Sequence, residues 1–336
     1  MASSENQESA PDRPLGRKSL DSTLADHGEE LFECVPNFSF GRDEGLLAEL
    51  VEVADAVEGV SVLDYSLDAD HNRAVLTFAG TSAGVAEAAF RLVEAAALQI
   101  DLTKHSGVHP RIGATDVLPI IPLRSEHRDL AIDLAHGVGA RIGRDLGIPV
   151  YFYGSAARTA ARRALPDVRR GGFEALRKAI GTDSARRPDE GPTDAIHPTA
   201  GATAVGVRPF LVALNIDLET EDVGVARGIA AKIREAGGGL PGLRALGLFL
   251  DSRGVAQVSM NVTDHARLSL VEIFEAVRDL AKEQGVDVRG SELIGLAPAA
   301  ALNETIAAAI RLRGFDSEQQ VLEARLLSVS TTGTKR

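Results

Sequence analysis

Residues 205–300 alternate between short apolar runs and longer segments that carry apolar residues at helical spacing. The short runs predict strands and the longer segments predict helices. In chain order the predicted elements are a strand at 210–216, a helix at 223–236, strands at 246–250 and 255–261, a helix at 268–284 and a strand that begins at 287–289. Asp-Ser-Arg-Gly, between the two middle strands, is typical of a hairpin turn. The order βαββαβ predicts a split βαβ, ferredoxin-like subdomain.

The first half of the chain shows a similar alternation. Strands are predicted at 31–35, 60–65, 73–78, 117–122 and 148–153, and helices at 44–57, 82–100, 125–146, 156–164 and 173–180. This pattern indicates a layered α/β (α+β) fold. The expected regions are a disordered tail at 1–30, a first subdomain at 31–180, a linker or ligand loop at 181–204, a second subdomain at 205–327 and a flexible tail at 328–336.

The composition is that of a globular protein with two domains. The chain has 336 residues, of which 44% are apolar, and a formal net charge of −12. The acidic charge argues against a nucleic-acid partner but leaves small anionic substrates open. The single cysteine, Cys34, excludes a disulfide within the chain and a Cys-rich zinc site. Because no stretch suits a secretory signal or a membrane span, we expect a cytoplasmic protein with no membrane partner.

Residues 104–116 gather two histidines, a lysine, an arginine and an aspartate in a segment that its glycines and proline keep from forming a regular helix. His105 and His109 are four residues apart, which suits zinc only on a helix, and no Cys or Glu completes a ligand set. We therefore predict no metal. Acid–base chemistry is the better use of one histidine, and Arg111 suits a carboxylate. A solvated polar loop is the alternative, and the spacing does not choose between the histidines.

Three other polar segments are candidates for a site. Residues 68–73, Asp-Ala-Asp-His-Asn-Arg, combine two carboxylates with a histidine and an arginine, although a solvated hairpin turn is the simpler interpretation. Residues 35–41 run from a strand end into a turn, a common ligand position that ordinary turn formers also occupy. Residues 191–203 are rich in small residues and could approach a flat or anionic ligand closely, or form a plain linker. They lack the spacing of a nucleotide-binding loop.

Taken together, these segments resemble the formiminotransferase (glutamate formimidoyltransferase) family. The likeness extends over residues 31–303 and predicts the form without a cyclodeaminase domain. The matching motifs are Glu-Cys-Val-Pro-Asn-Phe-Ser at 33–39, Asp-Ala-Asp-His-Asn-Arg at 68–73, Gly-Val-His-Pro-Arg-Ile-Gly-Ala-Thr-Asp at 107–116, Tyr-Gly at 153–154, His-Pro-Thr-Ala-Gly-Ala-Thr-Ala-Val-Gly at 197–206, Ala-Gln-Val-Ser at 256–259 and Gly-Ser-Glu-Leu-Ile-Gly-Leu at 290–296.

The resemblance implies two ferredoxin-like subdomains with mixed sheets flanked by helices, a ligand groove between them, and a homodimer. It implies formimino transfer from N-formimino-L-glutamate to N5 of tetrahydrofolate, the co-substrate, with His109 as the catalytic acid and base. The resemblance and the chemistry suggest as substrate-binding residues Asn37, Asp70, Asn72, Arg73, Arg111 and Asp116. The implied folate-binding residues are Gly191, Pro192, His197, Pro198, Thr199 and Gly201. Whether His105 assists His109 stays open.

Four positions depart from the pattern of the family. Phe40, Ser155 and Gly172 stand where the family usually has an acid, and Ser66 stands where His or Asp is common. Because a cationic amidinium donor favours nearby carboxylates, the donor could differ. Two alternatives therefore stand beside the main prediction. One is formyl or formimidoyl transfer to or from a specialised amine, and the other is a non-catalytic folate-binding protein.

Overall fold

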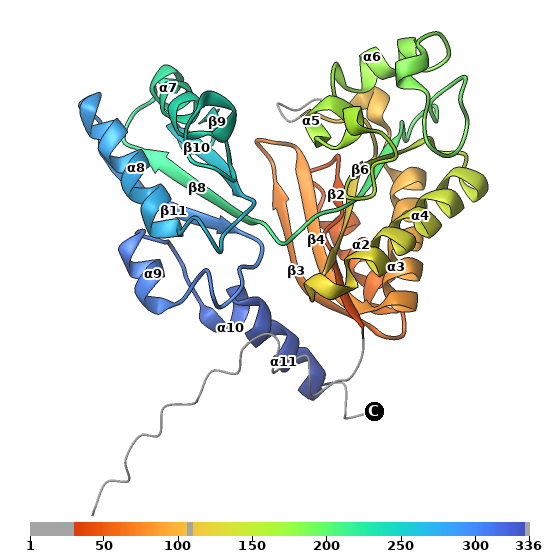
Figure 1. Ribbon diagram of the computed structural model, residues 1–336, viewed down its shortest axis with the longest axis horizontal. Coiled ribbons are helices and arrows are strands. Elements are labelled where there is room, and N and C mark those ends of the chain that lie inside the picture. Colours follow the sequence, from red (N-terminus) through yellow and green to blue (C-terminus); the bar gives the residue numbers. More distant parts are fainter. Residues whose placement is uncertain (1–29, 106–109, 333–336) are drawn as a thin grey trace, which may run out of the picture.

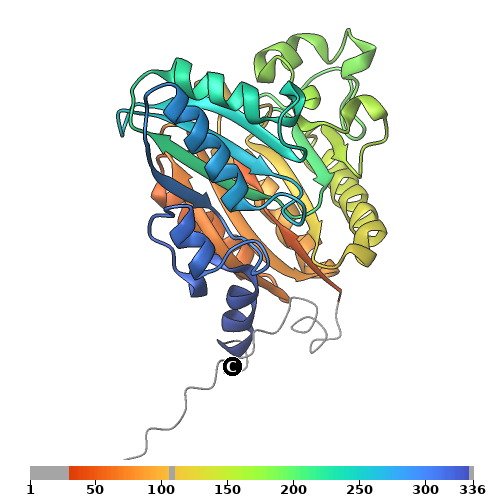
Figure 2. The same ribbon diagram turned by 60° about the vertical axis from the view of Figure 1, so that its left-hand side comes forward.

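The computed structural model describes residues 30–105 and 110–332 and shows two layered subdomains, each a sheet covered by helices (Figure 1). The long helices of both subdomains lie on the outer sides, so that the uncovered faces of the two sheets are turned toward each other. Figure 2 shows α7 (Val223–Ile233) and α8 (Leu270–Glu283) on the outer face of the second sheet. This arrangement confirms the α/β (α+β) class.

The first subdomain contains a seven-stranded mixed sheet. Its strands are β1 (Leu31–Cys34), β2 (Asn37–Phe38), β3 (Val60–Asp68), β4 (Arg73–Thr81), β5 (Thr115–Pro122), β6 (Val150–Gly154) and β7 (Thr203–Val207). The β1–β2 segment pairs antiparallel with both β4 and β5, and β3 pairs with the outer side of β4. With helices α2 (Glu44–Asp55) and α3 (Ser82–Gln99), these strands form a βαββαβ unit. Parallel strands β7 and β6 extend the sheet beyond β5, and α4 (Arg128–Asp145) packs there.

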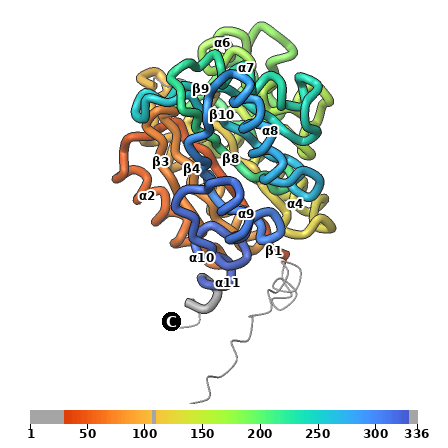
Figure 3. Tube along the Cα trace, turned by 90° about the vertical axis from the view of Figure 1, so that its left-hand side faces the viewer, coloured from red at the N-terminus to blue at the C-terminus, as the bar shows by residue number. Residues whose placement is uncertain are grey.

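The second subdomain is the βαββαβ unit that the sequence pattern predicts. Strands β8 (Val212–Leu218), β9 (Leu243–Leu250), β10 (Val255–Val262) and β11 (Val288–Ile294) form an antiparallel sheet in the order β11-β8-β10-β9. The predicted hairpin between β9 and β10 is confirmed. Three helices follow: α9 (Glu304–Ala309), α10 (Ser317–Gln320) and α11 (Leu322–Thr332), which Figure 3 shows below the sheet.

Two elements differ from the sequence prediction. The helix predicted at 156–164 is reduced to a 3₁₀ turn at Ala160–Arg162, because Pro166 starts a separate short helix, α5 (Leu165–Val168). Helix α6 (Gly172–Ala179) follows it. Strand β7, at the predicted junction between linker and second subdomain, belongs to the first sheet. The remaining 3₁₀ turns are Leu102–Lys104, Ser125–His127, Ser184–Arg186 and Glu235–Gly237.

Each subdomain has its own apolar core, and a third, smaller cluster joins them. Leu63, Ala79 and Leu123 of the first subdomain pack against Leu296, Leu322 and Leu326. Arg325 on α11 donates a hydrogen bond to the carbonyl oxygen of Leu63 (2.9 Å). The C-terminal helix therefore attaches the second subdomain to β3 of the first. Within the residues that the structure describes, no helix is long and apolar enough to cross a membrane.

Candidate active site

The turn between β3 and β4 is the centre of the candidate site. Asn72 in this turn adopts a left-handed φ of 50°, which asparagine tolerates better than most residues. Gly41 allows the turn to pack against the start of α2, since a Cβ there would lie 2.0 Å from the carbonyl oxygen of Asp68. A small cavity beneath the turn is lined by Phe38, Ser39, His71, Asn72, Arg73, His105, Arg111 and Asp116. Two motifs far apart in the sequence therefore meet here.

Asp116 and Arg73 both line this cavity. Asp116 is 3% exposed, accepts a hydrogen bond from the amide of Ile112 (2.7 Å) and pairs with Arg169. The pKa of the Arg73 guanidinium is lowered by burial and by the nearby positive charge of Arg169, while Asp68 and Asp116 oppose that shift. Asp116 thus holds the backbone at Ile112 and the side chain of Arg169 in place.

Arg111 reaches the cavity edge, where protein groups already occupy part of its guanidinium. Its Nη2 donates to the Glu174 carboxylate (2.9 Å) and to the carbonyl oxygen of His105 (3.2 Å). The buried Nε of Arg111 has no hydrogen-bond partner among the described residues. Gly172 lacks the acid that the family resemblance leads one to expect, and Glu174, two residues later, places a carboxylate on Arg111 instead.

His105 lies beside Arg111, and one of its ring nitrogens forms a hydrogen bond. Its Nε2 donates to the carbonyl oxygen of Asn72 (3.1 Å), and its buried Nδ1 has no partner among the described residues. Burial lowers the pKa of His105, and the charges of Arg111 and Arg42 lower it further. His109, the predicted catalytic residue, lies outside the described residues.

The other predicted substrate-binding residues lie around the cavity and not in its lining. The Asn37 side-chain amide donates to the carbonyl oxygen of Val35 (2.9 Å). Asp70 accepts a hydrogen bond from Ser252 (2.6 Å), which lies in the β9–β10 turn of the second subdomain. Of the predicted set, the structure brings together Asn72, Arg73, Arg111 and Asp116.

The predicted folate-binding residues separate into two groups. His197 and Gly201 bond to each other through both backbone amides (3.0 Å each), and the loop they close lies along Ile112 and Ala114. Within this loop Pro198 is exposed and the carbonyl oxygen of Thr199 accepts from the amide of Leu102 (2.9 Å).

The second group is Gly191 with its neighbour Pro192, at the other end of the segment. Gly191 (φ 82°) packs against α4, since a Cβ there would lie 3.1 Å from the Cα of Gly143. The structure therefore explains Gly191 by close packing.

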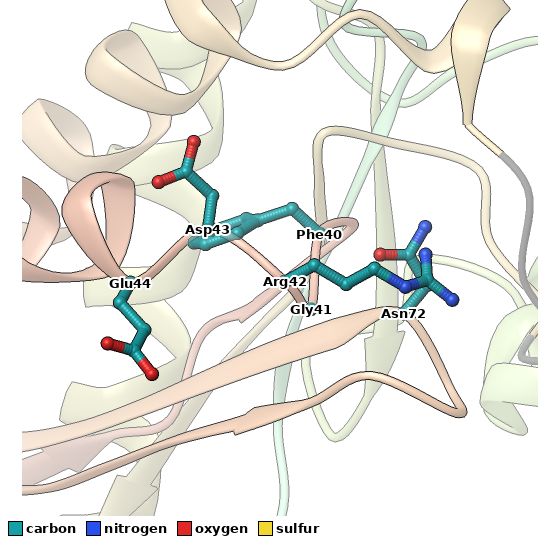
Figure 4. Close-up of a pocket in the computed structure, with 6 residues that line it drawn as sticks. All are labelled: Phe40, Gly41, Arg42, Asp43, Glu44 and Asn72. Atoms are coloured by element: carbon teal, nitrogen blue, oxygen red, sulfur yellow. The ribbon is translucent and has the colours of Figure 1, made fainter. Parts of the chain in front are cut away.

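A second, open pocket adjoins the turn on its other side (Figure 4). It is lined by Phe40, Gly41, Arg42, Asp43, Glu44 and Asn72. Arg42 donates to the carbonyl oxygen of Ala69 (2.6 Å), and Figure 4 shows Arg42 and Asn72 among the residues that line the pocket. Phe40 is 8% exposed, so its ring forms an apolar wall where the family usually has an acid. Asn72 lines both cavities.

Sequence reasoning missed several residues that surround the turn. The carboxylate of Asp68 binds the ring of His71, Arg169 pairs with Asp116, and Glu174 pairs with Arg111. Asp68 and His71 were visible as part of a polar motif, whereas Arg169 and Glu174 gave no signal because only packing brings them to the site. Among the described residues, no group of three His, Cys, Asp or Glu side chains could hold a metal ion.

Comparison with known families decides the classification. The profile described as "Formiminotransferase domain, N-terminal subdomain" matches residues 31–208, and that described as "Formiminotransferase domain" matches residues 213–324. The chain belongs to the formiminotransferase family.

The similarity to curated formiminotransferase relatives extends over most of the chain. Glutamate formimidoyltransferase of Streptococcus pyogenes serotype M1 is 44% identical over 89% of this chain and 99% of its own length. Glutamate formimidoyltransferase of Thermoplasma acidophilum is 39% identical over 88% of this chain and 97% of its own length. Formimidoyltransferase-cyclodeaminase of Sus scrofa is 39% identical over 83% of this chain, which corresponds to 52% of that relative. The two family profiles meet between β7 and β8, where the chain passes from one sheet to the other.

Proposed function

We propose that this formiminotransferase carries a formimino group from N-formimino-L-glutamate to N5 of tetrahydrofolate, and that it releases glutamate. The observation that carries the proposal is the 44% identity to a glutamate formimidoyltransferase along that relative's whole length. The cavity under the β3–β4 turn supports it, because cationic and amide groups suited to a dicarboxylate donor converge there. We further propose that the protein acts in the cytoplasm, as a homodimer, with tetrahydrofolate as its co-substrate and without a metal.

His109 is the proposed general acid and base. Attack of N5 on the amidine carbon requires loss of the N5 proton, and departure of glutamate requires a proton on its nitrogen. A positioned imidazole can accept the first proton and return it, at a contribution of ~10²–10⁴-fold to the rate. Arg111 would bind a carboxylate of the donor, and Asn72 and Arg73 would orient the donor from the turn, with Asn37, Asp70 and Asp116 supporting the site.

The proposed folate site lies along the loop of residues 191–201. His197 carries its hydrogen on Nε2 in the neutral ring, because its Nδ1 accepts the amide hydrogen of Ala200 (3.0 Å). Pro198, Thr199 and Gly201 would shape the surface against the folate ring system, and Gly191 and Pro192 would hold the loop against α4.

The proposal is tested by mixing the purified protein with tetrahydrofolate and N-formimino-L-glutamate. We expect absorbance from 5-formiminotetrahydrofolate and then from methenyltetrahydrofolate, and a rate reduced ~10²–10⁴-fold in His109→Ala. A matched control is His136→Ala, a histidine on α4 whose Nε2 bonds to the carbonyl oxygen of Ala156 (2.9 Å). Absence of product with this donor, or a His109→Ala rate equal to that of the unchanged protein, contradicts the proposal.

The main alternative, a specialised amine as donor or acceptor, is favoured by one observation. The buried ring of Phe40 makes an apolar wall in the open pocket, where an acid would suit a cationic substrate. Tetrahydrofolate binding without turnover of formiminoglutamate, followed by turnover of another formimino or formyl donor, would support this alternative. Folate binding without turnover of any donor would support the non-catalytic function.

A further inference from the structure

We propose that His71, held by the carboxylate of Asp68, is a second acid–base residue of this site and protonates the amine that leaves the donor. The inference rests on the proposed transfer reaction and revises one part of it: His109 keeps the role of base, and the proton that the leaving amine receives comes from His71 instead of His109. His71 belongs to the β3–β4 turn, and its side chain lines the cavity together with four of the predicted substrate-binding residues.

One carboxylate fixes His71 in two ways. Asp68 Oδ2 lies 2.5 Å from His71 Nδ1, and Asp68 Oδ1 accepts the backbone amide of His71 at 2.9 Å. Asp68 is itself fixed, since it ends β3 and pairs in register with Arg73. A ring held through Nδ1 while its backbone is anchored by the same side chain has little freedom to turn away from the cavity.

The pairing also determines which ring nitrogen exchanges a proton. Burial by itself would raise the pKa of Asp68, but hydrogen bonds from His71 and the charges of His71 and Arg73 lower it to about 2. An ionised carboxylate accepts and cannot donate, so Nδ1 carries the hydrogen of this pair. Nε2 is therefore the atom that gains or gives a proton. A carboxylate on Nδ1 stabilises the imidazolium that forms when Nε2 is protonated, as in hydrolase triads.

The surroundings of the ring suit such a role. The side chain of His71 is 11% exposed and is therefore shielded from bulk solvent. The charged and titratable groups that face the pair are Arg73, His105, Arg111, Asp116 and, from the second subdomain, Arg253. His105, in contrast, donates to a backbone carbonyl and has no carboxylate partner in the described structure. Of these two histidines, His71 alone has the partner that an acid–base imidazole needs.

The chemistry balances with two imidazoles. The bond from N5 to the amidine carbon forms as His109 takes the N5 proton, and the bond from that carbon to the glutamate nitrogen breaks as His71 gives that nitrogen its Nε2 proton. The products are 5-formiminotetrahydrofolate and the free amine of glutamate. His109 then holds one proton more and His71 one fewer, and exchange with solvent restores both. No oxidant, reductant or further reactant is needed.

The inference is tested with His71→Gln and Asp68→Asn on two donors: N-formimino-L-glutamate and an N-formimino donor with a less basic, better-leaving amine. We expect kcat of His71→Gln to fall ~10²-fold with formiminoglutamate and under ~10-fold with the second donor, because a better leaving group needs less protonation. The pH profile of kcat should lose its basic limb, while the Kd of tetrahydrofolate stays unchanged. Asp68→Asn should show the same pattern to a smaller extent.

The control is Glu87→Gln on α3, which removes a carboxylate paired with Arg91 (2.7 Å) and Arg141 (2.6 Å) away from the cavity and should leave kcat unchanged. Equal losses on both donors with an unaltered pH profile, or no loss at all, overturn the role of His71. If His71→Gln does not fold, the Asp68→Asn variant provides the test. The amide oxygen of the new asparagine can still accept the backbone hydrogen of His71, so the turn keeps this hydrogen bond. Absence of product from the unchanged protein would contradict the proposed function itself. Failure of the proposed function can therefore be distinguished from failure of the role proposed for His71.

Discussion

Arg111 illustrates how a single side chain is committed before any substrate binds. Its position was expected from the motif that contains it, but its contacts with Glu174 and with the backbone of His105 come from the folded chain. Glu174 is 62% exposed and Arg111 is 14% exposed, so this ion pair stands at the rim, where solvent screens it. A donor carboxylate can therefore compete with Glu174 for the guanidinium at small cost.

Replacement of Arg111 by lysine should raise the KM of the donor by about tenfold and leave kcat within a few-fold, because an ammonium cannot hold a carboxylate in two parallel hydrogen bonds. Steady-state kinetics with varied formiminoglutamate measure this. Arg141→Lys is the matched control, since Arg141 also pairs with a glutamate (2.6 Å) but on the outer helices. A change in kcat alone would indicate that Arg111 acts on the transition state and not on binding.

The start of α6 is an element whose conformation depends on glycine. Gly171 and Gly172 have φ values of 80° and 67°, in the left-handed region that other residues rarely adopt. The amide of Phe173, the next residue, donates to the carbonyl oxygen of Arg111 (2.8 Å), so this turn also positions the site. The acid that the family usually has at 172 would therefore be strained in the backbone observed here.

Gly172→Glu should lower the free energy of unfolding by about 1–2 kcal/mol, since a side chain in the left-handed region is strained. Urea denaturation gives this value. The control is Gly137→Ala in α4, where a Cβ would meet nothing within 4 Å. That change should raise stability by about 0.5–1 kcal/mol, as expected for alanine inside a helix. Equal stability of Gly172→Glu and the unchanged protein would show that the turn can relax.

The two subdomains bury an acid on the face of the first sheet that is turned toward the second. Glu33 is 2% exposed and pairs in register with Ala79, which belongs to the cluster between the subdomains. Phe32 and Cys34, its neighbours, face the helices. Burial raises the pKa of Glu33 from 4.5 to about 7, although the charge of Arg208 opposes the shift. Folding therefore favours the protonated form.

This shift predicts a stability that depends on pH. Below pH 4.5 the carboxyl is protonated in both states, and as the pH rises through 7 the unfolded state ionises first, so stability is lost over that window. The loss should be on the order of 3 kcal/mol relative to Glu33→Gln. Urea denaturation of both proteins at a series of pH values measures the difference. Asp68 titrates at lower pH and does not contribute in this window. If the free energies of unfolding of the two proteins changed in parallel between pH 4.5 and 7, the raised pKa of Glu33 would be contradicted.

Much of the fold was predictable because local pattern encodes local structure. The βαββαβ order of the second subdomain follows from apolar periodicity, and its predicted hairpin is confirmed. Strand β7 was not predicted, since its run of small residues resembles the adjacent loop and only pairing with β5 and β6 makes it a strand. The catalytic role of His109 follows from the family resemblance and stays a prediction.

Sequence pattern was sufficient to assign the layered class, the ferredoxin-like order and the family, because helix and strand periods and long motifs are properties of neighbouring residues. Contacts between distant segments came only from the folded chain. Ser252 and Asp70 are 182 residues apart in sequence and 2.6 Å apart in space, and Glu174 meets Arg111 across 63 residues. Packing, not local pattern, selects such partners, and packing also brought His71, whose ring is held by Asp68, to the same cavity as Arg111 and Asp116.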